Sequence, residues 1–205
     1  MADKPGDFFV GIIDFFGILV PGTVLLFLHG NLLTRYLTLP GASDSTVRWV
    51  VFAVGSYVLG HFLMAASVAL NRLHGFYRAE TKDPFYNEVK DKIAVPMKEK
   101  KRGDVFYRAF AYVRLKSPSA LAEIERQMAE YKMFRSLTVV FALDFVISLL
   151  IDKAPWLRGG FSLFLCLAAL WRFVYLLDWT RRITFEYYAL LHSNDSRDDR
   201  DPLIE

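Results

Sequence analysis

The sequence predicts an all-α polytopic membrane protein with four transmembrane helices and helical extensions into the cytosol. Of its 205 residues, 54% are hydrophobic and 16% are aromatic, which is more apolar than a soluble domain of this length. Four apolar runs approach the roughly 20 residues that a helix needs to cross the hydrocarbon layer of a membrane. The runs are continuous rather than alternating, so helices fit them and the strands of a barrel do not.

These runs set the expected order of segments along the chain. The second run is the clearest because no acidic residue interrupts it, whereas Asp144 lies near the middle of the third. The spans are expected at about 14–33, 47–70, 136–151 and 160–178. The predicted segments are an N-terminal cytosolic segment (1–13), transmembrane helices 1 and 2 (14–70), a basic cytosolic segment with a long helix from about 119 (71–135), transmembrane helices 3 and 4 (136–178), a cytosolic helical extension (179–193) and an acidic disordered tail (194–205).

Pro21 and Gly22 stand inside the first apolar run. A proline there frees a backbone carbonyl and is expected to kink the helix, which serves packing in some proteins and gating in others. The preceding residues, MADKPGDFF, lack the net-basic region of a cleavable signal peptide, so the first run is expected to remain as a span.

The distribution of basic residues predicts the orientation. Fifteen of the 25 Lys and Arg side chains lie in residues 71–135, and five more lie before the first predicted span or after the fourth, which makes twenty on one side. With four spans, both termini and this segment share one side of the membrane, which the positive-inside rule makes cytosolic. Both termini are therefore expected to lie in the cytoplasm.

The basic cytosolic segment contains two kinds of pattern. A helix is expected to start at Ser117 or Ser119, and an apolar stripe along it would pack against extensions of spans two and four, or form a groove for another protein. Residues 81–116 look less regular because prolines and a glycine interrupt them. They include a basic patch that is expected to bind anionic lipid or a partner protein, namely Lys98, Lys100, Lys101 and Arg102. A solvated charge run with no partner is an alternative. RNA contact is a less favoured alternative, based on interleaved aromatic residues, namely Phe106, Tyr107, Phe110 and Tyr112.

Three polar side chains inside the predicted spans are the candidate functional residues: Arg172, Asp144 and His61. Ionisable groups in a membrane are costly, so they suggest function. Counted from the predicted cytosolic ends of their spans, the three lie at similar depth. Arg172 is expected to pair with Asp144, to snorkel to the inner headgroups, or to line a water-filled path or an oligomer interface. Alternatively, Asp144 is protonated or is hydrogen-bonded to the neighbouring turn at Ser148. For His61, contact with another helix is favoured over a role as a titrating switch.

No pattern for catalysis, a cofactor or a metal site is found, so we predict no catalytic residues, no cofactor and no bound metal, and an enzyme is not expected. The single cysteine, Cys166, excludes an intrachain disulfide and is expected to be a small packing residue.

The layout of two spans, a basic segment, two spans and a polar tail carries a resemblance to a known group. With Pro21-Gly22 in span one, Gly60-His61 in span two and AEYKMFRSL leading into span three, the chain resembles the small membrane accessory proteins of bacterial antiviral systems. These are encoded beside the RNA-targeting effectors of type VI-B CRISPR loci and in RNA-editing defence operons. The chain lacks the HEPN-like signature of one such group, which favours the four-span group.

This resemblance implies a role in antiviral defence and a location in the bacterial inner membrane, and two hypotheses follow from it. In the first, a homo-oligomer permeabilises or perturbs the inner membrane, with polar residues lining or gating a path. In the second, a membrane-anchored adaptor recruits or regulates a soluble defence effector through its basic cytosolic face. A small transporter or lipid-handling subunit is a further alternative.

Overall fold

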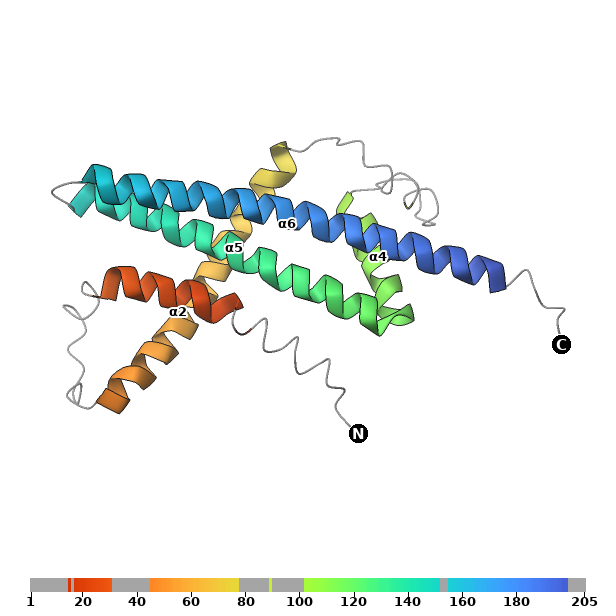
Figure 1. Cartoon of the computed structure of the whole chain (residues 1–205), viewed down its shortest axis with the longest axis horizontal. Helices are drawn as coiled ribbons and strands as arrows, with labels where there is room; N and C mark the ends of the chain where they lie inside the picture. The colour runs from red at the N-terminus through yellow and green to blue at the C-terminus, as the bar shows by residue number, and fades with distance from the viewer. Residues whose placement is uncertain are drawn as a thin grey trace. The chain divides into compact units, whose positions relative to one another are not determined.

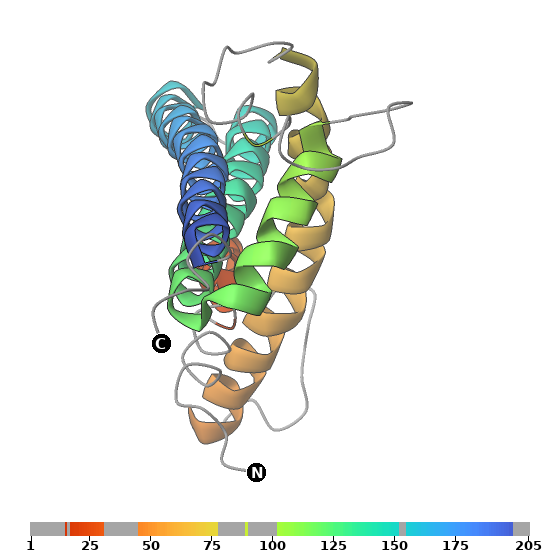
Figure 2. The ribbon, with the colours of Figure 1, turned by 90° about the vertical axis from the view of Figure 1, so that its right-hand side faces the viewer.

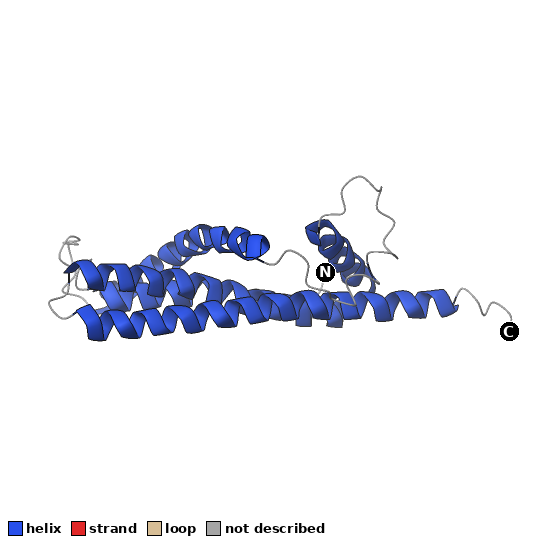
Figure 3. Cartoon of the chain, turned by 90° about the horizontal axis from the view of Figure 1, so that it is seen from above, coloured by secondary structure: helices blue, strands red, loops and turns tan. Residues whose placement is uncertain are grey.

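The structure is a computed structural model that describes residues 15, 17–30, 45–77, 89, 102–151 and 155–198. Every regular element in these residues is a helix, as Figure 3 shows, so the predicted all-α class is confirmed for them. The helices are the Gly17–Gly30 helix, α2 (Ser45–Tyr77), α4 (Arg102–Lys116), α5 (Pro118–Ile151) and α6 (Pro155–Asp198) (Figure 1).

Three of these helices are long and apolar enough to cross a membrane: Thr46–Asn71, Pro118–Ile151 and Trp156–Asp195. They coincide with the second, third and fourth predicted spans, which supports a membrane protein. The Gly17–Gly30 helix lies in the first predicted span and is also apolar, but its described part is shorter than a membrane crossing.

Backbone contacts divide the chain into two compact units. The first contains residues 1–77 and 129–175, and the second contains residues 78–128 and 176–205. The boundaries fall inside α5 and α6, so each of these helices contributes to both units.

In the first unit, α5 and α6 lie side by side and run antiparallel (Figures 1 and 2). Contacts along the pair fix one register. Moving along α5, they join Tyr131 to Phe173, Phe134 to Arg172, Thr138 to Cys166, Asp144 to Ser162 and Ser148 to Gly159. Each step toward the end of α5 is therefore a step toward the start of α6.

The Gly17–Gly30 helix crosses α2 with their backbones in contact. A Cβ atom added at Gly22 would collide with the Ser56 carbonyl group, and one added at Gly60 would collide with the Ile18 carbonyl group. Pro21, Gly22, Ser56 and Gly60 are all buried at this crossing. Gly60 therefore allows the Gly17–Gly30 helix to approach α2 closely, and that helix continues through Pro21. The kink at Pro21 and Gly22 stays a prediction.

The second unit has its own hydrophobic core. Apolar residues from α4 recur every four positions along one face of that helix, namely Val105, Ala109 and Val113, and they pack with Ala120, Ile124, Phe185 and Tyr188. The expectation that residues 81–116 are irregular is thus wrong for 102–116, because this spacing gives α4 a continuous buried face. The stripe at Ile124 packs against α6, as expected for an extension of span four.

Helix α5 starts where the sequence indicates. The Ala120 amide donates to Ser117 Oγ over 3.3 Å, so Ser117 caps the helix. Pro118 occupies the first helical position, where its missing N–H costs nothing.

Helix α6 continues further than the sequence suggests. It ends at Asp198, so the predicted disorder of the acidic tail from 194 onward is wrong for 194–198. Asp195 accepts a hydrogen bond from Tyr112 Oη over 2.6 Å and pairs with Lys116 Nζ at 2.8 Å. Burial, followed by the hydrogen bond to the Asp195 carboxylate, raises the pKa of Tyr112 to about 12. These contacts tie the last turns of α6 to α4.

Candidate functional site

A buried carboxylate, that of Asp144, joins three helices in the first unit. His29 Nε2 lies 3.1 Å from its Oδ1, Arg158 Nη2 donates to the same oxygen over 2.8 Å, and Ser162 Oγ donates to Oδ2. Arg158 Nη2 also lies 3.4 Å from the Leu28 carbonyl oxygen. We call His29, Asp144, Arg158 and Ser162 the Asp144 cluster.

The close approach of α5 and α6 makes this cluster possible. A Cβ atom at Gly159 would lie 2.9 Å from Ser148 Oγ, so a larger residue there would require the Ser148 side chain to shift. Ser162 follows Gly159 by almost one turn, and Asp144 precedes Ser148 by one turn, so the same approach brings Ser162 and Asp144 together. Ser148 Oγ itself donates to the Phe145 carbonyl, so it is not bonded to Asp144 as one alternative proposed.

Exposure differs sharply within the cluster. The side chains of Asp144 and His29 are 3% and 7% exposed, whereas that of Arg158 is 42% exposed. A buried carboxylate is tolerated when it is paired and hydrogen-bonded. In the described part of the chain, no group of three or more His, Cys, Asp and Glu side chains could hold a metal ion. The arrangement therefore fits a charge-compensated tie between helices.

The predicted pairing of Arg172 with Asp144 is wrong. In the observed register Asp144 lies opposite Ser162 and Arg172 lies opposite Phe134. Arg172 and Ser162 are ten positions apart on α6, or roughly 15 Å at about 1.5 Å per residue. The prediction counted depth from a span that begins at 136, but α5 passes through that position without a break. Because residue 136 is not the end of a helix, the depth of Asp144 counted from it was not comparable with the depth of Arg172 counted along α6.

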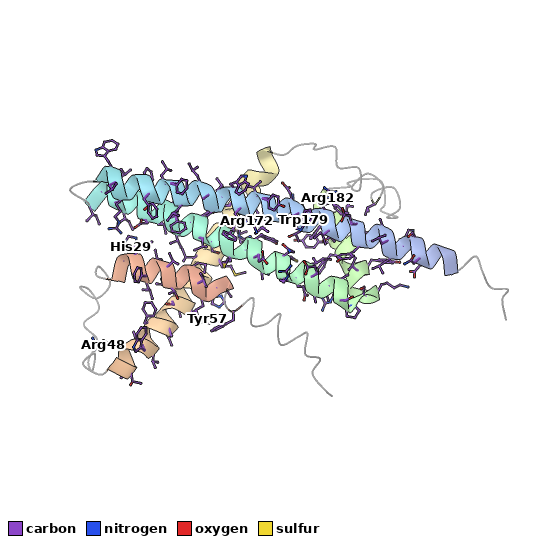
Figure 4. The ribbon with its side chains drawn as sticks, viewed as in Figure 1. His29, Arg48, Tyr57, Arg172, Trp179 and Arg182 are labelled. Carbon is purple, nitrogen blue, oxygen red and sulfur yellow. The ribbon has the colours of Figure 1, made fainter. Side chains whose placement is uncertain are left out.

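Arg172 contacts aromatic rings instead. Its Cζ atom lies 5.9 Å from the Phe134 ring centroid and 5.5 Å from that of Tyr175. Such contacts contribute about 0.5–2 kcal/mol, more where the cation is desolvated. Figure 4 shows Arg172 along α6 and His29 on the Gly17–Gly30 helix, at separate places. A gating role for Arg172 stays a prediction.

His61 occupies the exposed face of α2. Its ring meets that of Tyr57 edge to face at 4.6 Å, and Tyr57 in turn stacks on Phe15 at 5.5 Å. Both His61 and Tyr57 are exposed, whereas Gly60, next to His61, is buried against the Gly17–Gly30 helix. The helix contact expected at this position is therefore made by Gly60, and the His61 side chain points elsewhere.

A second polar cluster lies between α2 and α5. Arg135 is 4% exposed and donates from Nε to Ser67 Oγ over 2.9 Å, and Ser67 Oγ lies 3.5 Å from Ser136 Oγ. In the sequence, Arg135 directly precedes the predicted third span (136–151), where a charge outside the membrane is expected. The small polar Ser67 on the opposing helix was the available signal that it could be buried.

The basic patch falls mostly outside the described residues. Lys98, Lys100 and Lys101 lie outside them, and Arg102 begins α4 with only its backbone described. Three of the four aromatic residues considered for RNA stacking, namely Phe106, Phe110 and Tyr112, pack against the core of the second unit. Tyr107 is 69% exposed. Most of these rings are therefore occupied by packing.

Comparison with protein-family models, curated proteins and solved structures finds no match. The resemblance to antiviral accessory proteins thus remains an expectation from the sequence.

Proposed function

We propose that this protein is an oligomeric membrane effector, an accessory of bacterial antiviral defence that permeabilises the inner membrane. In this proposal the Gly17–Gly30 helix belongs to a transmembrane span that precedes the other three in the chain, which makes four spans in all. Both termini then lie in the cytoplasm. The three apolar helices, the basic middle segment and the resemblance described above support it.

The exposed His61 is the observation that carries the proposal. It lies in the middle of the candidate span Thr46–Asn71. In the most apolar stretch of this span 22% is buried inside the chain, compared with 33% and 28% in the other two candidate spans. A polar ring in contact with lipid at that depth is unfavourable, so such residues usually face protein or a water-filled cavity. A second copy of the chain, or a path formed between copies, provides both.

The Asp144 cluster takes a different role in this proposal. Its carboxylate is compensated within one chain, so it holds the helices of each subunit together. His61 replaces Asp144 as the residue that we expect to line the path or the interface between subunits. Arg172 stays a secondary candidate because its cation already contacts two rings.

Dye release from vesicles tests the proposal. Purified protein is reconstituted into phosphatidylethanolamine and phosphatidylglycerol vesicles loaded with a self-quenching dye. We expect release with the natural sequence and a several-fold lower release with His61→Leu, which remains apolar enough to insert. Val58→Leu, at another exposed position of α2, is the matched control and is expected to behave as the natural sequence. Vesicles that stay sealed at every protein density would contradict the effector function.

A second candidate function, the membrane-anchored adaptor, is favoured by the separate core of the second unit. This unit buries residues of α4, α5 and α6 that are distinct from those of the first unit, and the basic patch ends in the sequence where α4 begins. If the adaptor function holds, replacing Lys98, Lys100, Lys101 and Arg102 by Gln abolishes recruitment of a soluble partner to the membrane, and His61→Leu leaves it unchanged.

A further inference from the structure

Arg135 is a buried cation whose charge is not compensated by the described residues. The Arg135 side chain is buried, with 4% of its surface exposed. Within the described part of the chain, it makes one hydrogen bond, from Nε to Ser67 Oγ. No carboxylate of the described residues is paired with it. Asp144, by contrast, has both Arg158 and His29 beside it. The buried charge of Asp144 therefore has an opposite charge beside it, whereas that of Arg135 does not among the described residues.

Hydrogen-bond accounting shows what Arg135 still offers. Ser67 Oγ donates its hydrogen to the Met64 carbonyl over 2.7 Å and accepts from Arg135 Nε. The Ser136 hydroxyl is therefore the donor in any bond between the two serines. A guanidinium has five N–H donors, and the four on its terminal nitrogens are not used by Ser67. Two adjacent pairs of N–H donors match the spacing of oxygens in a phosphate or carboxylate group.

A neighbouring amide is also incompletely bonded. Asn71 follows Ser67 by one turn on α2, and its buried Oδ1 has no hydrogen-bond partner among the described residues. An amide can exchange its oxygen and nitrogen by a half-turn about its last bond, and it then presents a donor. A group with several acceptor oxygens would pair with Arg135 and with this amide.

We propose that Arg135, together with Ser67, Ser136 and Asn71, forms a binding site for a phosphate group between α2 and α5. The position along the helix points to the source of that phosphate. Arg135 is sixteen positions before the end of α5 at Ile151, or roughly 24 Å at about 1.5 Å per residue. The hydrocarbon layer is about 30 Å thick, so with Ile151 near one surface Arg135 lies close to the headgroups of the other. An anionic phospholipid presents its phosphate at that level.

This proposal is independent of the proposed effector function. Free inorganic phosphate offers the same chemistry as a headgroup, so the test separates the two sources. The full-length protein is purified in detergent without lipid. Its thermal midpoint and its bound ligands, seen by native mass spectrometry, are measured with dioctanoyl phosphatidylglycerol, with dioctanoylglycerol, which lacks the phosphate, and with inorganic phosphate.

Two substitutions isolate the site. Arg135→Gln removes the charge, and we expect it to weaken binding of dioctanoyl phosphatidylglycerol at least tenfold. Arg182→Gln is the matched control, because Arg182 is an exposed arginine of α6 that pairs with Glu186, and it should bind as the natural sequence does. Arg135→Lys keeps the charge without the paired donors and should fall between them.

The pattern of binding among the three ligands identifies the source of the phosphate. Binding of the phospholipid, but not of dioctanoylglycerol, that depends on Arg135 supports a headgroup site. If inorganic phosphate binds with the same dependence and the lipid does not, the phosphate site stands and its lipid source is wrong. Equal binding by the natural sequence and Arg135→Gln overturns the proposal. A structural arginine would also lower the midpoint of the lipid-free protein when replaced, whereas removal of an uncompensated charge should leave that midpoint unchanged or raise it.

Discussion

At the scale of single residues, the sequence identifies which polar groups are unusual but does not identify their partners. Asp144 stands out in an apolar run, and the structure confirms that it is buried. Its partner is Arg158, which the sequence places in a connection and the structure places in the first turn of α6. Partner choice depends on the register of α5 and α6, in which Gly159 lies against Ser148. Span lengths carry no information about that register.

The unequal exposure of Asp144 and Arg158 predicts unequal costs of replacing them. Arg158→Met leaves a buried carboxylate without its main counter-charge and should destabilise the protein by about 3 kcal/mol. Asp144→Asn leaves a half-exposed arginine that can reach solvent or headgroups, so its cost should be smaller. Unfolding in mixed micelles measures both, and the double variant should recover part of the loss of Arg158→Met. A larger loss for Asp144→Asn would contradict this account of the cluster.

At the scale of elements, helix starts were easier to predict than helix continuity. The cap at Ser117 and the proline after it are local signals, and α5 begins where they indicate. Helix α4 was missed because Pro96 and Gly103 suggested an irregular segment, although Val105, Ala109 and Val113 have the spacing of a buried helix face. The last turns of α6 were missed because their acidic composition resembles a disordered tail. Tertiary contacts through Asp195 override that composition.

The crossing of the Gly17–Gly30 helix and α2 predicts a sharp dependence on two glycines. Gly22→Ala or Gly60→Ala places a methyl group against backbone, which cannot move aside, and should destabilise the protein by about 1–3 kcal/mol. Gly30→Ala is the control on the same helix because a Cβ atom there has no neighbour within 4 Å. Thermal midpoints in detergent compare the variants. Equal midpoints for Gly22→Ala and Gly30→Ala would show that the two helices do not cross at Gly22.

The contact between α4 and the end of α6 predicts a pH effect. The Tyr112 pKa is raised to about 12, so the neutral phenol is favoured by folding. Its contribution to stability is complete below pH of about 10, the ordinary tyrosine pKa, and is lost as the pH rises toward the folded value. Tyrosinate absorbance, as a difference from Tyr112→Phe, should show the transition at lower pH in Asp195→Asn. An unchanged transition would mean that Asp195 does not favour the neutral phenol.

At the scale of the whole molecule, membrane character follows from composition, because long continuous apolar runs have few alternatives. Assembly does not follow from composition. It depends on which face of each helix is left uncovered, and that face is known only once the helices pack. The sequence named His61 as a candidate but could not distinguish a histidine packed inside the chain from one on the exposed face of α2.

The mass of the detergent-solubilised protein shows whether the chain assembles into an oligomer through the exposed face of α2. Light scattering with the detergent contribution subtracted gives that mass for the natural sequence and for His61→Leu. We expect a discrete oligomer, several times the 23.6 kDa of one chain, and a smaller species for His61→Leu. A monomer of the natural sequence across several mild detergents would contradict it.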